Sequence, residues 1–401
     1  MYPYAWQETT ADNGHRFAFC GAVGNCAFFV QPTRVLTCEG IIKLTINLTT
    51  YGLTNYFEDF AQATPELTLA RIISQHRDLY QVVSERGQQL AQVSGKLNYQ
   101  LTDPTSYPAV GDWVLMTATS TTDQAVIEQI LPRQSLLARS AAGTGRQGQA
   151  IAANLTTIFI CMALNGDFNV RRLERYLTMA WDSGATPVVV LTKVDLCPDL
   201  DAKMAQLADS TMGVDVISCS AKTGAGFDAV NAYLLPGKTV AFIGSSGVGK
   251  STLINHLLGT DALLTKTIRE DDAKGRHATT ARQLIVLPQG GLVIDTPGMR
   301  ELQLLSGNFD QSFADVTALA KKCKFRDCQH QGEPGCAVQT AIASGELSAD
   351  RLASYQKLQQ ELAYQGLTAR ERENAKIERL FGGKSAMKQV VKQVRQKNKR
   401  R

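Results

Sequence analysis

Short apolar runs separated by polar turns characterise the sequence between residues 66 and 132. Five such runs follow one another, at 70–73, 79–84, 90–97, 112–118 and 125–130. Closely spaced short strands predict a small barrel or sandwich. An OB-fold is the leading candidate, although periodicity alone does not separate it from an SH3-like barrel. The small, polar and glycine-rich segment 139–149 is expected to be a linker.

From about residue 153 to residue 304, apolar runs alternate with amphipathic stretches. The apolar runs predict strands at 157–164, 187–192, 214–218, 239–244, 283–288 and 292–295. The amphipathic stretches predict helices at 170–182, 199–212 and 250–258. This alternation predicts a parallel sheet with helices on both faces. Another helical region is expected at about 348–380.

The composition fits a globular protein, because 44% of the 401 residues are hydrophobic. That length is enough for about two to four domains. Long apolar windows and a secretory leader pattern are both lacking, so neither a membrane span nor secretion is expected. The nine cysteines include one cluster and are otherwise scattered, which indicates the reducing cytoplasm rather than a disulfide framework.

The formal net charge of +5 conceals a strongly basic tail. Segment 383–401 holds eight lysines and arginines and no acid, so the remaining residues carry −3. Such a tail is either a nucleic-acid-binding arm or a solubilising end. Residues 1–45 show no clear periodicity and form an unassigned N-terminal extension.

A phosphate-binding motif lies between an apolar run and a helical pattern. Gly244, four further residues, and then Gly249, Lys250 and Ser251 match the P-loop spacing. The glycines let backbone N–H groups surround phosphates, Lys250 reaches the outer phosphates during catalysis, and the Ser251 hydroxyl contributes to a Mg²⁺ shell. The predicted phosphate-binding residues are Gly244, Ser245, Ser246, Gly247, Val248, Gly249, Lys250, Ser251 and Thr252.

The sequence GLVIDTPG, at 291–298, places an aspartate at the end of an apolar run. Asp295 can bind Mg²⁺ through water, and the N–H of Gly298 can contact the terminal phosphate. A DxxG string alone is weak evidence for a nucleotide-binding motif. After a strand and downstream of a P-loop, it is good evidence for one.

Two further motifs indicate guanine as the base. In LTKVDL the Asp195 carboxylate can accept hydrogen bonds from two N–H groups of guanine, a pair that adenine lacks. Thr192 stands where many GTPases have Asn. In ISCSAK the N–H of Ala221 would contact the guanine oxygen. The predicted base-site residues are Thr192, Lys193, Val194, Asp195, Ser220, Ala221 and Lys222.

The order of these motifs is unusual. TKVD and SAK precede the P-loop, and DTPG comes last. This is the order of a circularly permuted GTPase, in which the original termini are joined and the chain opens elsewhere. DTPG therefore leads directly into the C-terminal segment, so nucleotide state could move that segment.

A cysteine- and histidine-rich segment follows. Its four candidate ligands are Cys323, Cys328, His330 and Cys336. Three thiolates and one imidazole form a closed tetrahedral set, which predicts structural rather than catalytic zinc; the alternative is a chance cluster of reduced cysteines. Residues 324–326 mix basic and aromatic groups that could face RNA or form a solvated rim.

These motifs resemble the circularly permuted ribosome-assembly GTPases of the RsgA, or YjeQ, family. The resemblance spans about 66–380 and also includes FNVRRLERYL, GRHATT and CKFRDCQHQGEPGC. It implies a multidomain protein with three parts: an OB-fold β-barrel at 66–136, a permuted P-loop α/β GTPase domain at 150–304 and a mostly helical zinc-binding domain at 305–382. The basic tail at 383–401 lies beyond the resemblance. It further implies one Zn²⁺ per chain, Mg²⁺ with GTP, a monomer, and binding to the small ribosomal subunit and its rRNA late in assembly, with GTP hydrolysis stimulated by the subunit.

The catalytic residue is less clear than the binding motifs. Met299 follows DTPG and cannot orient the attacking water, so slow intrinsic hydrolysis is expected. His277, within GRHATT, is the nearest candidate for that role, or it contacts RNA or solvent instead. Thr279 or Thr280 is the expected Mg²⁺-sensing threonine, because Ala278 stands where Thr is common.

The leading interpretation is a GTP-hydrolysing assembly factor for the small ribosomal subunit. One alternative is a GTPase switch for a protein or membrane partner. Another is an RNA-binding module with a vestigial nucleotide site, although the complete set of Lys250, Ser251, Asp295 and Asp195 argues against it.

Overall fold

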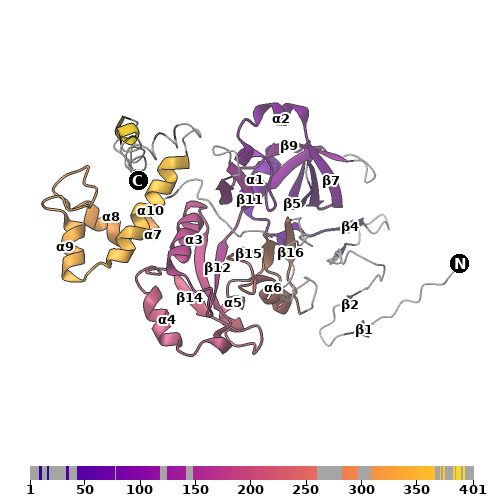
Figure 1. The fold of residues 1–401 in the computed structure, drawn as a ribbon. Helices are drawn as coiled ribbons and strands as arrows, with labels where there is room; N and C mark the ends of the chain where they lie inside the picture. The colour runs from indigo at the N-terminus through magenta and orange to yellow at the C-terminus, as the bar shows by residue number, and fades with distance from the viewer. Residues whose placement is uncertain are drawn as a thin grey trace. The chain divides into compact units, whose positions relative to one another are not determined.

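The computed structural model describes residues 43–76, 78–117, 124–140, 148–259, 282–296 and 309–365, with a few short stretches and single residues elsewhere (Figure 1). The chain divides into two units, 1–31 and 32–401. The described part of the first unit contains one antiparallel pair, β1 (Thr9–Thr10) with β2 (Arg16–Phe17). In the second unit, β3 (Thr33–Val35) pairs with β4 (Lys43–Thr45).

Three residues after this pair, Leu48, Tyr51 and Phe57, belong to the hydrophobic core. They lie in the 3₁₀ helix η1 (Leu48–Tyr51), capped by the Asn47 side chain, and in helix α1 (Asn55–Gln62). Phe57 is buried and stacks on Trp113, with ring centroids 5.6 Å apart. No element was predicted from the sequence here, because η1 and α1 are only four and eight residues long.

Five strands form a closed barrel. They are β5 (Thr68–His76), β6 (Leu79–Ser84), β7 (Gly87–Val93), β8 (Trp113–Thr117) and β9 (Ala125–Ile130). Their order is β5-β6-β7-β9-β8, and β8 pairs back with β5. The β7–β9 pair is parallel and the other pairs are antiparallel. The barrel is therefore of the OB type, as favoured from the sequence.

The strand predicted at 90–97 extends beyond the C-terminal end of the observed strand. The strand β7 ends at Val93, and helix α2 (Gly95–Gln100) begins after it. Ser94 is the N-cap, since its Oγ accepts a hydrogen bond from the Leu97 N–H at 3.1 Å. The serine cap ends the strand although the apolar pattern continues.

The predicted linker at 139–149 is wrong at both of its ends. Strands β10 (Leu136–Ser140) and β11 (Gly148–Ala153) pair antiparallel, with Arg139 opposite Gln149. Leu137 and Ile151 are buried, and their burial holds the hairpin on the core.

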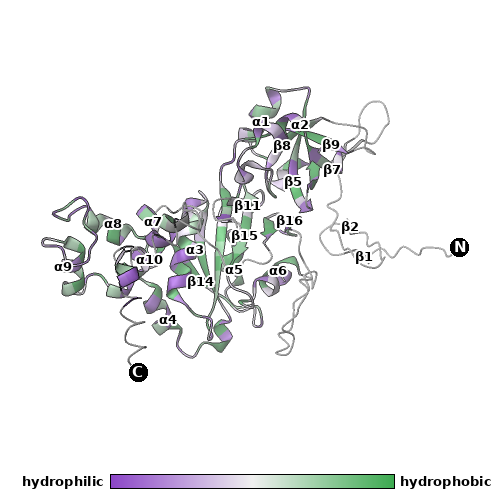
Figure 2. Cartoon of the chain, turned by 45° about the horizontal axis from the view of Figure 1, so that its top comes forward, coloured by the Kyte–Doolittle hydropathy of each residue, from purple (hydrophilic) through white to green (hydrophobic). Residues whose placement is uncertain are grey.

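A six-stranded sheet forms the centre of the following region. Its order is β14 (Asp215–Ser218), β13 (Thr186–Thr192), β12 (Thr157–Ala163), β15 (Thr239–Ile243), β17 (Leu292–Asp295) and β16 (Arg282–Val286). The first five strands run parallel, as predicted, but β16 is antiparallel to β17, so the prediction of a parallel sheet is wrong for this strand. Figure 2 shows the hydrophobic character of the central strands.

Helices cover both faces of this sheet, as predicted. They are α3 (Val170–Asp182), α4 (Leu200–Leu207), α5 (Phe227–Asn231) and α6 (Lys250–Leu258). Alternate residues of β12 separate the two faces: Ile160 packs in the cluster that contains α3 and α4, and Phe159 packs in the cluster that contains α5 and α6. The helix predicted at 199–212 is shorter, because α4 is capped by Asp199 and ends at Leu207.

The barrel and the sheet are continuous. Strand β16 pairs with β5 through Arg282 opposite Gln75 and Gln283 opposite Ser74. The two parts thus share backbone hydrogen bonds and form one sheet of eleven strands.

Arg71 of β5 also links the two parts, with 1% of its surface exposed. Its guanidinium donates to four neutral acceptors, namely the carbonyls of Tyr51, Gly111 and Asn154 and the Thr239 hydroxyl. Burial lowers the pKa of Arg71 to about 9, although Asp112 acts in the opposite direction. Because Thr239 begins β15, this arginine ties the barrel to the strand that precedes the P-loop.

The described part of the C-terminal region is mostly helical, as predicted, and contains α7 (Phe309–Ser312), α8 (Ala314–Ala320), α9 (Ala337–Ser344) and α10 (Ala349–Gln365). Most of the predicted helical segment after residue 365 lies outside the described residues. Arg351 of α10 is 5% exposed and bonds to Glu174 of α3 at 2.8 Å. It also bonds to both carboxylate oxygens of Asp315, at 3.0 and 3.1 Å. Within the described residues, no helix is both long and apolar enough to cross a bilayer.

Candidate nucleotide site and metal centre

The P-loop backbone has the conformation that its glycines permit. Gly244 has φ +145°, and a Cβ there would lie 2.4 Å from the carbonyl oxygen of Cys161. Gly249 has φ +102° and precedes α6 without any side-chain cap. The first N–H groups of α6 are thus left for an anion, and the helix dipole adds positive potential at the same point.

Lys250 folds over this loop. Its Nζ donates to the carbonyl oxygens of Gly244 at 2.6 Å and Ser245 at 2.8 Å. Burial lowers the pKa of Lys250, and nearby acidic groups, Asp295 among them, oppose that shift. These carbonyl contacts hold the ammonium at the phosphate loop, in reach of an anion bound there.

Asp295 ends β17 beside the P-loop. Burial raises the pKa of its carboxyl group, whereas Lys250 and the Thr296 N–H lower it. The Thr296 hydroxyl donates to the Phe242 carbonyl at 2.8 Å and fixes the DT turn on β15. An oxygen ligand suited to Mg²⁺ thus lies near the lysine predicted to contact phosphate.

The TKVD turn is bonded directly to the P-loop. The Thr192 hydroxyl donates to the Val248 carbonyl at 2.5 Å, and the Lys193 Nζ donates to the Gly247 carbonyl at 2.8 Å. Lys193 has φ +60°, which turns the chain sharply after β13. Thr192 therefore supports the loop through its hydroxyl, although it lacks the amide of the more common Asn.

The SAK turn orients the predicted base-recognition carboxylate. The Ser220 hydroxyl donates to Asp195 Oδ1 at 2.6 Å. The same hydroxyl oxygen accepts the N–H groups of Lys222 and Thr223, each at 3.3 Å. This network fixes the rotation of the Asp195 carboxylate before any base binds.

All these groups lie at the carboxyl ends of neighbouring strands, which is where open α/β sheets bind ligands. The structure brings together the P-loop, TKVD, SAK and Asp295. Six residues discussed from the sequence lie outside the described residues: His277, Ala278, Thr279, Thr280, Gly298 and Met299.

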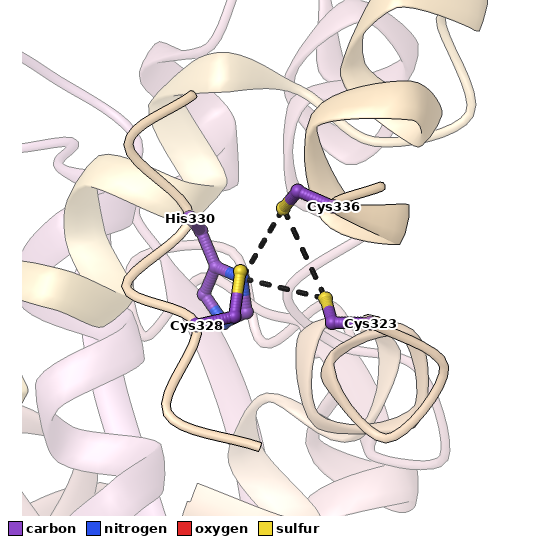
Figure 3. A group of neighbouring side chains, drawn as sticks. All are labelled: Cys323, Cys328, His330 and Cys336. Carbon is purple, nitrogen blue, oxygen red and sulfur yellow. Dashed lines mark hydrogen bonds between the residues drawn. The ribbon is translucent and has the colours of Figure 1, made fainter. Parts of the chain in front are cut away.

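The Cys/His cluster is closely packed. The ligand atoms of Cys323, Cys328, His330 and Cys336 all lie within 4.8 Å of one another, and Figure 3 shows the four side chains converging. Sγ of Cys336 lies 3.9 Å from Sγ of Cys323 and 3.4 Å from Nδ1 of His330.

These distances fit zinc. Tetrahedral Zn–S bonds of about 2.3 Å place two sulfur atoms about 3.8 Å apart. The polar groups around the cluster are also ordered: Glu333 accepts the N–H groups of Gln329 and Gln331 at 2.8 and 2.7 Å, and Gln339 donates to the His330 carbonyl at 2.5 Å. The four donors would hold a structural ion with no open position.

Comparison with known proteins agrees with this geometry. Residues 130–305 match the family model described as RsgA GTPase. A protein of Lactiplantibacillus plantarum named small ribosomal subunit biogenesis GTPase RsgA 2 is 59% identical over 348 residues, which cover 86% of this chain and 98% of that protein. The chain belongs to the RsgA GTPase family.

Other RsgA relatives extend the comparison. A small ribosomal subunit biogenesis GTPase RsgA 1 of Oceanobacillus iheyensis is 42% identical, with 77% of this chain and 88% of the relative covered. The crystal structure of YjeQ from Thermotoga maritima has a TM-score of 0.55 and 28% identity, covering 74% and 99% of the two chains. YloQ, described as a circularly permuted GTPase, has a TM-score of 0.51 and 25% identity, covering 74% and 95%. The permuted order predicted from the sequence is thus confirmed.

A model described as ABC transporter also matches, over residues 227–399. That span contains the P-loop, which many nucleotide-binding families share, but it contains neither TKVD nor SAK. The RsgA match includes all of these motifs.

Sequence reasoning missed one residue at this edge of the sheet. Asp167 lies in the turn after β12, and its carboxylate accepts a hydrogen bond from the Ser245 hydroxyl of the P-loop. The turn reads NGDFN and matches no phosphate-binding pattern. Its place after a buried strand of the same parallel sheet was the available signal.

Proposed function

We propose that this chain is a GTPase that acts in biogenesis of the small ribosomal subunit. The observation that supports this most strongly is the direct bonding of the TKVD turn to the P-loop, through Thr192 and Lys193, in a chain with permuted motif order. Two relatives, 59% and 42% identical to this chain over most of their length, are named as such GTPases.

In the proposed complex each motif has a separate task. Asp195, held by Ser220, accepts two hydrogen bonds from the guanine edge, while Lys193 lies along the base and Ala221 donates its N–H. Residues 244–252 surround the phosphates, and Lys250 transfers its hydrogen bonds from loop carbonyls to phosphate oxygens.

Mg²⁺ would be held by oxygen ligands from Ser251 and, through water, Asp295, with Thr279 or Thr280 as a further ligand. When bound, it neutralises phosphate charge. The Ser251 hydroxyl and the Asp295 carboxylate are the hard donors that this ion prefers. For the attacking water we retain His277 as the proposed orienting residue and Gly298 as a donor to the terminal phosphate.

The remaining assignments are also proposals. Cys323, Cys328, His330 and Cys336 would bind one structural Zn²⁺ per chain, as their spacing supports. The protein would act as a cytoplasmic monomer and contact rRNA of the small subunit. The proposed domains are 66–136, 150–304 and 305–382, followed by the basic tail at 383–401.

The first test is a GTPase assay with and without purified small ribosomal subunits. We expect slow intrinsic hydrolysis and a large increase when subunits are added. A rate that small subunits leave unchanged, while GTP still binds, would favour a GTPase switch for a non-ribosomal partner.

A second test concerns the base. Asp195→Asn should weaken GTP binding and relax the preference for GTP over ATP, because one acceptor oxygen becomes a donor. Competition binding measures this selectivity. Asp201→Asn is the matched control, because Asp201 is an exposed carboxylate in the first turn of α4. Unchanged selectivity in Asp195→Asn would contradict the base-site assignment.

The tail at 383–401 allows a third test. Its deletion should weaken cosedimentation with small subunits and reduce the salt dependence of binding, because each engaged cation releases counterions from phosphate. GTP affinity should not change. Equal binding with the same salt slope would show that the tail is only a solubilising end.

A further inference from the structure

A carboxylate lies directly against the predicted phosphate loop. Asp167 Oδ2 accepts the Ser245 hydroxyl, and Asp167 Oδ1 forms an ion pair with Arg172 Nη2 at 2.7 Å. Arg172 also donates to the Asp167 main-chain carbonyl. One carboxylate is therefore shared between the P-loop and the first turns of α3.

The turn that carries this carboxylate is fixed by its own hydrogen bonds. The Asp167 N–H donates to Asn165 Oδ1 at 3.1 Å, and the Arg172 N–H donates to Asn169 Oδ1 at 2.9 Å. The side chains of Asp167 and Arg172 are 34% and 30% exposed, so water only partly screens their charges. Because these two hydrogen bonds hold the turn and the start of α3, the two charges stay at the edge of the P-loop.

A negative charge at this place opposes the binding of a polyphosphate. Ser245 is the residue whose carbonyl oxygen binds Lys250, the predicted phosphate-contacting lysine. Asp167 is also close enough to Lys250 to counter the lowering of its pKa by burial. The carboxylate thus competes with phosphate for the same positive potential, while Arg172 offsets part of its charge.

We propose that the Asp167–Arg172 pair sets the strength of phosphate binding at the P-loop: Asp167 weakens it, and more for GTP than for GDP, whereas Arg172 strengthens it. The difference between nucleotides arises because GTP carries an additional negatively charged phosphate. This inference rests on the proposed binding of guanine nucleotides at residues 244–252. In this proposal Asp167 lowers nucleotide affinity through its charge and thereby favours release of the nucleotide.

The test compares two substitutions of opposite charge effect. Asp167→Asn keeps an oxygen that can accept the Ser245 hydroxyl but removes the charge. We expect it to tighten binding of a non-hydrolysable GTP analogue about three- to tenfold, and of GDP by less. Arg172→Gln should weaken both nucleotides, and the analogue more. Both effects should diminish when ionic strength rises from 0.05 to about 0.5 M, because exposed charges are screened.

Dissociation constants of the full-length protein are measured by titration calorimetry, with circular dichroism to confirm folding. Asp199→Asn is the matched control, since Asp199 caps α4 by accepting the Ala202 N–H at 2.9 Å and Asn can do the same. Its nucleotide affinity should equal that of the parent protein.

The outcomes are distinct. Opposite shifts for the two variants, with salt dependence, support the proposal. Weaker binding in both variants means that the pair only holds the turn in place, and the proposal is wrong. The proposal is also wrong if Asp167→Asn tightens the binding of GDP and of the GTP analogue equally and independently of salt. If the parent protein binds no guanine nucleotide at all, the proposed function itself fails, and this inference fails with it.

Discussion

Two buried arginines connect separate parts of the second unit, and their charges are compensated differently. The barrel–β15 contact and the α3–α10 contact are called the two joints. Arg71 joins the barrel to β15 and bonds only to neutral carbonyls and a hydroxyl, so burial lowers its pKa to about 9. Arg351 joins α10 to α3 and α8 and bonds to the carboxylates of Glu174 and Asp315. These partners outweigh burial, and the pKa of Arg351 is raised.

The difference shows two ways of building a joint from the same side chain. A guanidinium among neutral acceptors satisfies many carbonyls at once, but it keeps part of its desolvation cost. A guanidinium between two carboxylates is well compensated, but its removal leaves charges buried without a partner. The α3–α10 joint should therefore be more sensitive to substitution of its arginine than the barrel joint.

Substituting one ligand of the proposed zinc site should have the largest effect, and it should affect the C-terminal helices rather than the barrel. Cys328→Ser is expected to lower zinc content well below one per chain, since thiolate is a far better zinc ligand than a hydroxyl. Because structural zinc contributes folding free energy, α8 and α9 should loosen while the surroundings of Arg71 stay intact. Elemental analysis and hydrogen exchange measure the two effects.

The control for that experiment is Cys197→Ser, which changes a free cysteine outside the cluster. It should leave the zinc content unchanged. Full metal occupancy in Cys328→Ser would contradict the assigned ligand set.

Arg351→Met tests the carboxylate-rich joint. Glu174 is 3% exposed and would remain buried without its cation, so stability should fall by about 3–5 kcal/mol. The loss of stability is measured by urea unfolding, with the release of zinc as the signal of unfolding. Adding Glu174→Gln should restore part of the stability, because it removes the unpaired charge; a double variant as unstable as the single one would argue against this explanation.

Arg71→Met tests the neutral joint and should have the smaller effect. It removes hydrogen bonds but leaves no unpaired buried charge, because Asp112 keeps its ion pair with Arg133 at 2.7 Å. A loss of about 1–3 kcal/mol is expected, from the acceptors left unsatisfied. Trp113, which lies 5.4 Å from the Arg71 guanidinium, provides a local fluorescence probe of unfolding. If Arg71→Met costs as much as Arg351→Met, the distinction between the joints is wrong.

Neither arginine could be identified from the sequence. Arg71 stands in the strand-like run LARIIS, and Arg351 in the helical run ADRLAS. In such patterns an arginine usually faces solvent, and its burial depends on residues far away in the chain. The antiparallel direction of β16 was equally hidden, because a strand pattern carries no information about direction.

The strands and motifs were predictable for the opposite reason. Strand β15 is buried throughout and β13 almost throughout, so their apolar runs are continuous, and they lead into the P-loop and the TKVD turn, respectively. The TKVD, SAK and P-loop turns follow from that local chemistry. Asp167 was missed because its contact with Ser245 is tertiary and belongs to no spacing rule.

The pairing of β16 with β5 has a consequence for dissecting this protein. A fragment beginning after the barrel would expose the edge of β16 at Arg282 and Gln283, and strand edges with unpaired N–H and C=O groups promote association between chains. The barrel therefore also acts as a cover for the GTPase sheet. Excising either part would expose unpaired strand edges, so a truncated GTPase region is expected to self-associate more readily than the full chain.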